Sequence, residues 1–311
     1  MIDQCAYLGQ PDCRRISNGT AEVIVATAIG PRIIRYALAG GENILAELPD
    51  VAVPTPIGTW KPWGGHRLWA APEAMPRSYA PDNDPVEFSP IGEHSIHLKG
   101  QTEPATGIGK EMTVMLDPAG SGVMVHHRIT NHGPWGIDLA PWGLTIMNGG
   151  GVTIIPQEPF RPHGEELLPA RPMILWHYTD LTDPRWTFGR RYILLRTDEA
   201  LHHPQKIGVA NRRGWAAYHR NGDLFIKRFE YRPGAEYPDF GSNNETYTAG
   251  TFMELESLAP MAHLEPGESA EHTERWELHA NVDIGTTEET ISLALAPFVG
   301  TDNISRAGID S

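Results

Sequence analysis

Short runs in which apolar and polar residues alternate dominate this chain. A period of two places every second side chain on the same face, which is typical of strands with one buried face. The clearest early runs are residues 21–27 and 32–38, with a Gly30-Pro31 turn between them. Further runs are predicted as strands at residues 95–99, 110–116, 123–131, 138–147, 151–156, 192–196, 206–210, 214–219, 224–231, 252–258 and 272–279.

Helical periodicity is scarce. The best helix is predicted at about residues 286–296, where threonines and early glutamates open it and Pro297 is expected to close it. Many short strands with so few helices favour an all-β fold, a large antiparallel β-sandwich, over an α/β fold. Without an internal repeat or low-complexity linker, we expect a single domain over residues 1–311, with a core of about 20–280. Residues 156–172 are predicted to form a long Pro-rich loop.

Composition and charge narrow the classes of partner. The 32 Gly and 27 Pro suit a chain with many strands and turns. The net charge of −14 is opposite in sign to that of a protein that grips phosphate backbones, so nucleic acid is not an expected partner. No stretch has the roughly 20 apolar residues that a membrane span needs, and the start does not resemble a signal peptide. We therefore expect a soluble, cytoplasmic protein that does not bind membranes.

Several short motifs follow one another in a characteristic order. They are residues 30–34 (Gly-Pro-Arg-Ile-Ile), 43–47 (Asn-Ile-Leu-Ala-Glu), 64–69 (Gly-Gly-His-Arg-Leu-Trp), 129–131 (Ile-Thr-Asn), 140–144 (Ala-Pro-Trp-Gly-Leu), 227–229 (Lys-Arg-Phe), 237–239 (Tyr-Pro-Asp), 253–260 (Met-Glu-Leu-Glu-Ser-Leu-Ala-Pro) and 274–276 (Glu-Arg-Trp). In order and spacing these motifs resemble the galactose mutarotase-like superfamily, and within it a little-characterised branch related to the aldose 1-epimerases. The likeness covers roughly residues 20–280.

The resemblance implies a supersandwich of two large antiparallel sheets with an open, concave sugar site. In aldose 1-epimerases a histidine acts as general acid on the ring oxygen and a glutamate acts as general base on the anomeric hydroxyl. An arginine and an aspartate hold other hydroxyls. The implied partner is a small carbohydrate or oligosaccharide, and the implied reaction needs no metal or organic cofactor.

Glu254 and Glu256 are the candidate catalytic carboxyls. They alternate with apolar residues in a predicted strand, so both side chains are expected on one face. Two carboxyls beside apolar residues can have separated pKa values, and one can then serve as a base. A solvated outer face is the other explanation for such a pair. The resemblance points to Glu256 as the base, with the roles exchanged if the strand contains a one-residue bulge.

His66 and Arg67 follow two glycines and lie among tryptophans, including Trp69. Glycines allow close approach of the backbone, and indole faces commonly pack against sugars. The guanidinium of Arg67 offers a rigid fork of donors for hydroxyls or a carboxylate. We expect His66 to be catalytic and Arg67 and Trp69 to bind substrate. The alternative is a Trp-rich turn in which Arg67 pairs with Glu73 and His66 caps a backbone carbonyl.

One position departs from the resemblance. Typical aldose 1-epimerases carry a catalytic histidine in the strand where this chain has Trp142, and an indole cannot usefully donate that proton. His127, His163 and His66 are the candidates to replace it, and Trp142 is left as a substrate-binding residue. Asp239 lies in a turn-rich segment, where it either orients substrate hydroxyls or forms the turn.

Three functions remain open from the sequence. The leading hypothesis is an aldose 1-epimerase-like isomerase that acts on a sugar or sugar derivative by general acid/base catalysis. The same fold and carboxyl pair also suit a glycoside-cleaving hydrolase or lyase, or a carbohydrate-binding protein without catalysis. No spacing of His or Cys indicates a metal site, although scattered ligands could converge in three dimensions. The oligomeric state does not follow from the sequence.

Overall fold

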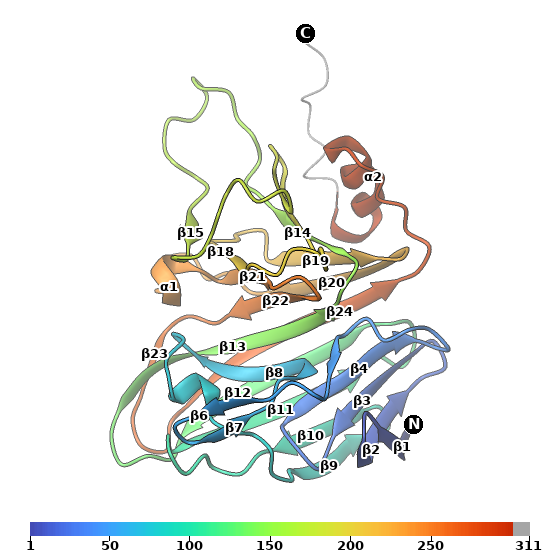
Figure 1. Cartoon of the computed structure of the whole chain (residues 1–311), viewed down its shortest axis with the longest axis vertical. Helices are drawn as coiled ribbons and strands as arrows, with labels where there is room; N and C mark the ends of the chain where they lie inside the picture. Colours follow the sequence, from blue (N-terminus) through green and yellow to red (C-terminus); the bar gives the residue numbers. More distant parts are fainter. Residues whose placement is uncertain (301–311) are drawn as a thin grey trace.

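The fold is a sandwich of two large antiparallel sheets, described for residues 1–300 by a computed structural model. Figure 1 shows strands from the first part of the chain in the lower half and those from the second part in the upper half, with the long β13 and β24 between them. This arrangement confirms the predicted all-β sandwich. Within the described residues, neither α-helix is long and apolar enough to cross a membrane.

The first sheet has 12 strands and carries both glutamates of the candidate pair. In spatial order its main path is β1 (Ile2–Tyr7), β2 (Gln10–Ser17), β3 (Ala21–Ala26), β4 (Arg32–Leu38), β8 (Trp63–Ala71), β13 (Ile137–Asn148), β22 (Phe252–Leu258), β21 (Asn244–Thr248), β18 (Gln205–Val209) and β15 (Met173–Leu175). The short strands β5 (Glu47–Leu48) and β23 (Ala262–Leu264) pair with β8 and β13.

The second sheet has 10 strands. Their order is β16 (Trp186–Phe188), β17 (Tyr192–Arg196), β14 (Val152–Pro156), β19 (Trp215–Arg220), β20 (Asp223–Phe229), β24 (Ser269–His279), β12 (Val123–Asn131), β11 (Ile108–Leu116), β10 (Ser95–Lys99) and β9 (Glu87–Gly92). The remaining elements are the hairpin of β6 (Val53–Thr55) and β7 (Gly58–Trp60), the 3-10 helix η1 (Arg77–Tyr79), and the helices α1 (Pro238–Gly241) and α2 (Glu288–Val299).

The main hydrophobic core lies between the two sheets. Aromatic rings from both sheets meet there, with the ring of Tyr36 5.9 Å from that of Trp276 and 6.1 Å from that of Phe225. Alternate residues of each strand point into this core, which is why the period of two was visible in the sequence. The other face of the 12-stranded sheet is then free to carry a site.

Strand β8 was not predicted, and the reason lies in its surroundings. Its residues after Trp63 are buried, so it lacks the alternation that marks a strand with one wet face. Gly64 and Gly65 have φ of +82° and +70°, and a Cβ on either would lie within about 2.0 Å of a backbone oxygen of a neighbouring segment. Only glycine allows this approach. The segment is therefore a central strand and not a Trp-rich turn.

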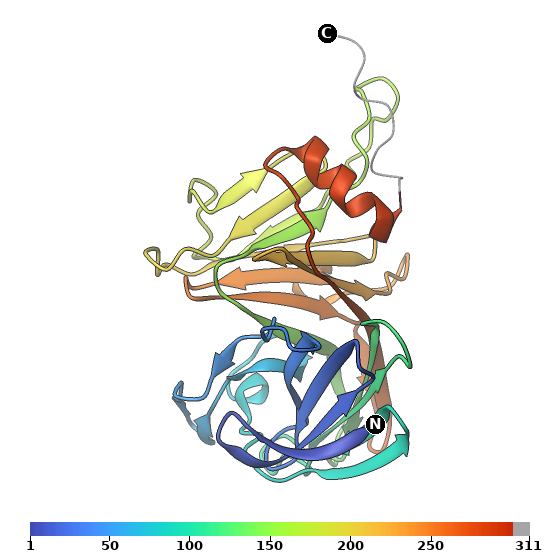
Figure 2. The ribbon, with the colours of Figure 1, turned by 90° about the vertical axis from the view of Figure 1, so that its right-hand side faces the viewer.

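Helix α2 begins where the sequence predicted and ends later. Thr287 is its N-cap, with a capping box to Thr290. Pro297 does not close the helix, which continues to Val299, because in the last turn the lost backbone hydrogen bond can be replaced by water. Ile291 and Leu295 pack α2 onto the outer face of the 10-stranded sheet (Figure 2).

Candidate functional site

A cleft of about 490 Å³ opens on the outer face of the 12-stranded sheet. Most of its lining is aromatic or aliphatic. Glu73, Lys206 and Glu254 are the lining residues with carboxyl or amino side chains. The aromatic lining residues are Trp60, Trp69, Tyr79, Trp142, Trp176, Tyr178, Tyr247 and Phe252. An apolar cleft with a few polar groups is the usual form of a small-molecule site.

The register of the sheet places Glu254 and Glu256 on this face together. Glu254 lies opposite Tyr247 of β21, and Glu256 lies opposite Glu245 of the same strand. Directly opposed residues of an antiparallel pair point to the same side of the sheet. The two glutamates share a face, as predicted, but that face is not a solvated one: Glu256 is fully buried.

Glu256 lies beneath the cleft and is held by two donors. The indole Nε1 of Trp142 donates to its Oε2 at 2.8 Å, and Lys206 Nζ donates to the same oxygen at 3.2 Å. Burial raises the pKa of Glu256, while Lys206 and the indole act in the opposite direction. Trp142 thus binds one of the candidate catalytic carboxyls in addition to lining the cleft.

Lys206 is the cation around which the buried carboxyls gather. Its Nζ lies 2.8 Å from Glu245 Oε2, and it lies between the rings of Trp142 and Trp176, at 4.8 and 4.7 Å from their centres. Burial alone would lower the pKa of Lys206, but Glu245 and Glu256 outweigh it and raise that pKa well above its usual range. Lys206 therefore remains charged.

Asp239, in α1, lies beside this cluster of Lys206 and the buried carboxyls. Burial raises the pKa of Asp239, the charge of Lys206 lowers it, and its carboxyl is within hydrogen-bonding reach of Glu245. Burial also raises the pKa of Glu245 well above its usual range. Asp239 has φ +50°, so it also forms part of a turn, which was the alternative role predicted for this residue.

Glu254 is the carboxyl that faces the cleft without a protein partner. Among residues 1–300 its side chain makes no hydrogen bond or ion pair, and it lines the cleft beside Lys206. Burial raises the pKa of Glu254 to about 8, and the charge of Glu256 contributes in the same direction. At neutral pH Glu254 is therefore mainly a protonated acid that faces the cleft.

Arg67 lies beneath the aromatic wall of the cleft. Its guanidinium donates to the backbone oxygen of Pro62 and lies 4.7 Å from the ring centre of Trp60 and 5.8 Å from that of Trp69. Its Nε and Nη1 have no hydrogen-bond partner in the described part of the chain. Burial and the neighbouring Arg32 lower the pKa of Arg67 to about 9.

The expected alternative pairing of Arg67 with Glu73 is absent from residues 1–300. Glu73 instead accepts a hydrogen bond from the hydroxyl of Tyr79. Glu73 therefore stands on the rim of the cleft with its second carboxylate oxygen available to a ligand.

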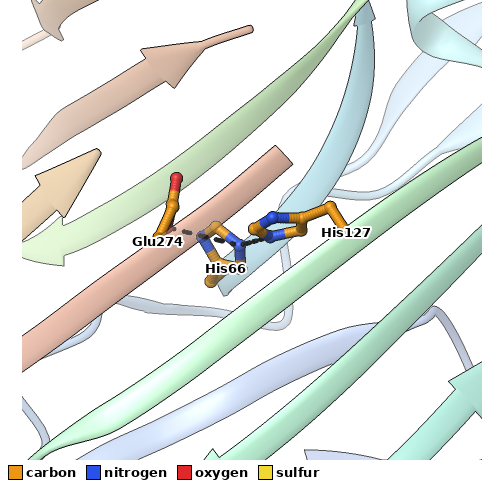
Figure 3. A group of neighbouring side chains, drawn as sticks. All are labelled: His66, His127 and Glu274. Carbon is orange, nitrogen blue, oxygen red and sulfur yellow. Dashed lines mark hydrogen bonds and ion pairs between the residues drawn. The ribbon is translucent and has the colours of Figure 1, made fainter. Parts of the chain in front are cut away.

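His66 lies on the opposite side of the sheet from Arg67, between the two sheets. Consecutive strand residues point to opposite faces, so the prediction of a joint His66-Arg67 site is wrong for this reason. Figure 3 shows the His66 ring beside His127 and Glu274, with His66 Nε2 2.7 Å from His127 Nε2 and 3.9 Å from Glu274 Oε2. All three side chains are buried, and the 12-stranded sheet separates them from the cleft.

The spacing of these three residues could hold a metal ion, since one ligand atom from each lies within 4.8 Å of the others. Hydrogen bonds already account for the same atoms. His127 Nδ1 donates to the backbone oxygen of His272, which leaves its Nε2 to accept from His66. Lys227 Nζ lies 2.7 Å from Glu274 Oε1 and supplies the cation that this carboxylate requires. The geometry is that of a buried polar network.

The burial of this network keeps its histidines neutral. Burial lowers the pKa of His127 to about 4 and that of His66 well below its usual range. Burial alone would raise the pKa of Glu274, but Lys227 and the histidines outweigh it and lower that pKa. A histidine that stays neutral and dry cannot exchange a proton with a ligand on the other side of the sheet.

His163, the third candidate acid, is exposed in the loop between β14 and β15 and is absent from the cleft lining. Trp69 and Trp142 do line the cleft, as expected for sugar-binding residues. Of the residues that the sequence singled out, Glu254, Trp69 and Trp142 line the cleft, Glu256 and Arg67 lie beneath it, and Asp239 lies near Lys206 and Glu245.

Lys206, Glu245 and Glu73 were missed. Lys206 and Glu245 occur in strands of ordinary appearance, and only the pairing of β18, β21 and β22 brings them to Glu256. A lysine inside the strand predicted at residues 206–210, next to Ile207, was the only signal available for Lys206. Glu73 lies in a loop, where a sequence offers no such pattern.

Comparisons with known proteins agree with this fold. No family model and no curated protein matches the sequence. Similar solved structures include galactose mutarotase-like proteins. A galactose mutarotase-like protein from Lactobacillus casei ATCC 334 is 12% identical, with a TM-score of 0.55 over 86% of this chain and 100% of that one. YeaD from Salmonella typhimurium, a protein assigned as a mutarotase, is 12% identical, with a TM-score of 0.57 over 86% and 90% of the two chains.

A TPR-domain containing protein from Parabacteroides distasonis ATCC 8503 is also similar, with 11% identity and a TM-score of 0.59. The match covers 89% of this chain but 49% of that one, so this chain spans about half the length of that protein. At these identities the likenesses establish the galactose mutarotase-like fold, and the chemistry has to be argued from the cleft.

Proposed function

We propose that this protein is a carbohydrate-active enzyme of the aldose 1-epimerase kind, which interconverts forms of a sugar or sugar derivative in the cleft. The observation that carries the proposal is Glu254, an unpartnered carboxyl of raised pKa among aromatic side chains. Aromatic walls suit the C–H faces of a sugar, and a group with a pKa near the working pH suits proton transfer.

Interconversion of anomers requires an acid and a base on neighbouring oxygens. Protonated Glu254 donates its proton to the ring oxygen, the bond from that oxygen to the anomeric carbon breaks, and the Glu73 carboxylate takes the proton of the anomeric hydroxyl. The open aldehyde rotates about its bond to the next carbon and the steps reverse. Protons and electron pairs balance without a cofactor, and each carboxyl regains its initial state after reclosure.

Glu256 and Lys206 act on this chemistry from beneath the cleft. Lys206 and the indole of Trp142 favour the ionised form of Glu256, and the negative charge of Glu256 in turn helps keep the proton on Glu254. Environments that separate the pKa values of two carboxyls are a general way to assign acid and base roles. In this scheme Glu256, the residue favoured by the sequence, tunes Glu254, while Glu254 contacts the substrate.

A second candidate is the cleavage of a glycosidic bond. The observation in its favour is that Glu254 and Glu73 are two carboxyls on the lining of one cleft, which is the arrangement glycosidases use. Glu254 would protonate the leaving oxygen in that case. Both candidates make Glu254 the acid, so one variant tests them together.

The test follows anomer exchange and glycoside cleavage by NMR with a panel of aldoses and glycosides. The expected result is exchange above the uncatalysed rate, lost at least tenfold in Glu254→Gln and kept in the control Glu289→Gln, whose carboxyl is exposed on α2. Cleavage without anomer exchange would replace the first candidate by the second. Binding of sugars with neither reaction would leave a carbohydrate-binding protein and overturn the enzyme proposal.

A further inference from the structure

Six of the eight aromatic residues that line the cleft fall into two groups, and the other two, Trp142 and Trp176, pack against Lys206. The first, called the β8 group, contains Trp60, Trp69 and Tyr79, whose ring centres lie 5.1–5.6 Å apart. The second, called the β21 group, contains Tyr178, Tyr247 and Phe252, with ring centres 6.1 Å apart for Tyr247 and Phe252 and 6.5 Å apart for Tyr178 and Tyr247. No ring contact between the two groups occurs within residues 1–300.

The order of strands in the sheet separates the groups. Trp69 is on β8 and Tyr247 is on β21, with β13 and β22 between them. Three steps between strands correspond to about 14 Å. Glu254, on β22, lies in this interval and is directly opposite Tyr247. The two aromatic groups therefore flank the proposed acid.

Both groups are close to Glu254 in electrostatic terms as well. Burial raises the pKa of Tyr79 and that of Tyr247, and the charge of Glu254 contributes to both shifts. One tyrosine of each group is thus close enough to Glu254 for the charge of that carboxyl to change the pKa of the tyrosine. The cleft volume of about 490 Å³ is larger than a single pyranose ring occupies.

We propose that the substrate contains at least two linked pyranose rings that pack on the two aromatic groups, with the ring oxygen and the anomeric carbon of its reducing-end ring at Glu254. This inference rests on the proposed function, because it takes the cleft to be a sugar site. Aromatic rings offer large apolar faces to the C–H surfaces of sugars. Faces about 14 Å apart are farther apart than one pyranose ring can cover. A monosaccharide would use one group and leave the other exposed to water.

The test compares the binding of glucose and galactose with that of lactose, cellobiose and maltose by calorimetry. It uses Glu254→Gln protein, so that turnover does not interfere. At least one disaccharide is expected to bind tenfold or more tightly than either monosaccharide. Tyr178→Ala and Trp60→Ala should each remove most of that advantage. Trp135→Ala is the matched control, since its side chain is 79% exposed and absent from the cleft lining.

The outcomes separate this inference from the proposed function. Equal affinities for monosaccharides and disaccharides, or an advantage unchanged in both Tyr178→Ala and Trp60→Ala, would overturn the two-ring substrate. Tight disaccharide binding without any reaction in the native protein would support the two-ring site and reject the enzyme. Loss of binding in Trp135→Ala would show that the variants act through folding, and thermal melts of each variant identify that case.

Discussion

The indole Nε1 of Trp142 donates a hydrogen bond to Glu256 Oε2 at 2.8 Å. Trp142 occupies the position at which the resemblance expects a catalytic histidine. That histidine would donate a proton to the substrate, whereas Trp142 donates a hydrogen bond to the carboxyl of Glu256. A hydrogen bond to an ionised group stabilises the charged form by about 1.5–3 kcal/mol. The indole and Lys206 both act to lower the pKa of Glu256, against the effect of burial.

Trp142→Phe tests this relationship. The ring face remains while the donor is lost, so the pKa of Glu256 should rise and that of Glu254 should fall as the negative charge beside it weakens. The pH above which activity declines should move down by roughly one unit, the shift that corresponds to about 1.4 kcal/mol. The pH–rate profile measures it.

Trp276→Phe is the matched control for Trp142→Phe. The indole of Trp276 donates to Glu274 Oε2 at 2.8 Å, the same bond in the interior network. That variant should lose stability and keep the native pH–rate profile. A profile equally displaced in both variants would mean that the effect comes from general loosening of the fold.

Glu254→Gln should stabilise the protein in alkaline solution while it abolishes activity. The folded pKa of about 8 is raised above the ordinary value, so the carboxyl is protonated in the native state and ionised in the unfolded state between these two values. Ionisation then favours unfolding progressively as the pH rises from about 4.5 to about 8. Glutamine is neutral throughout and removes this dependence.

The gain expected from Glu254→Gln is up to about 4–5 kcal/mol at pH 8, at about 1.4 kcal/mol for each pH unit between 4.5 and 8, and near zero at pH 4, where both side chains are neutral. Denaturant melts at the two pH values measure it. Equal unfolding free energies of native and variant protein at pH 8 would show that Glu254 does not have a raised pKa, and would remove it as the acid.

Lys206→Met should be among the most damaging single changes near the cleft. Glu245 and Glu256 would then be buried without their cation, and breaking a buried ion pair on one side costs about 3–5 kcal/mol. Urea melts of Lys206→Met measure the loss. Adding Glu245→Gln to Lys206→Met should recover part of it, because the neutral amide no longer needs the charge.

The alternation of apolar and polar residues predicts which face of a strand a side chain lies on, but it does not predict which residues of other strands lie beside that side chain. The alternation around Glu254 and Glu256 predicted that they share a face, because β22 has one face in the core and one on the cleft. The same rule could not predict which face His66 lies on. Strand β8 is buried on both faces and so shows no alternation, and its two glycines are not typical of a strand. Lys206 could not be placed beside Glu256 from sequence, because their contact depends on pairings between strands about 50 residues apart.

The last prediction concerns His66, which the resemblance made a catalytic residue and the fold places between the sheets. His66 hydrogen-bonds His127 through Nε2 and Thr145 through Nδ1, at 2.7 and 2.8 Å. His66→Gln should therefore lower the unfolding free energy by about 1–3 kcal/mol, the cost of leaving buried polar groups unpaired. The rate per folded molecule and its pH dependence should stay as in the native protein.

His126→Gln is the control for His66→Gln. His126 is adjacent to His127 but half-exposed, and its ring lies 3.4 Å from the exposed carboxyl of Glu271, so this variant should change neither stability nor rate. A hundredfold loss of rate in His66→Gln, with an unfolding transition unchanged from that of the native protein, would instead show that His66 takes part in the reaction. Because the sheet separates His66 from Glu254, that result would require the substrate to reach the space between the sheets, and the cleft would cease to be the catalytic site.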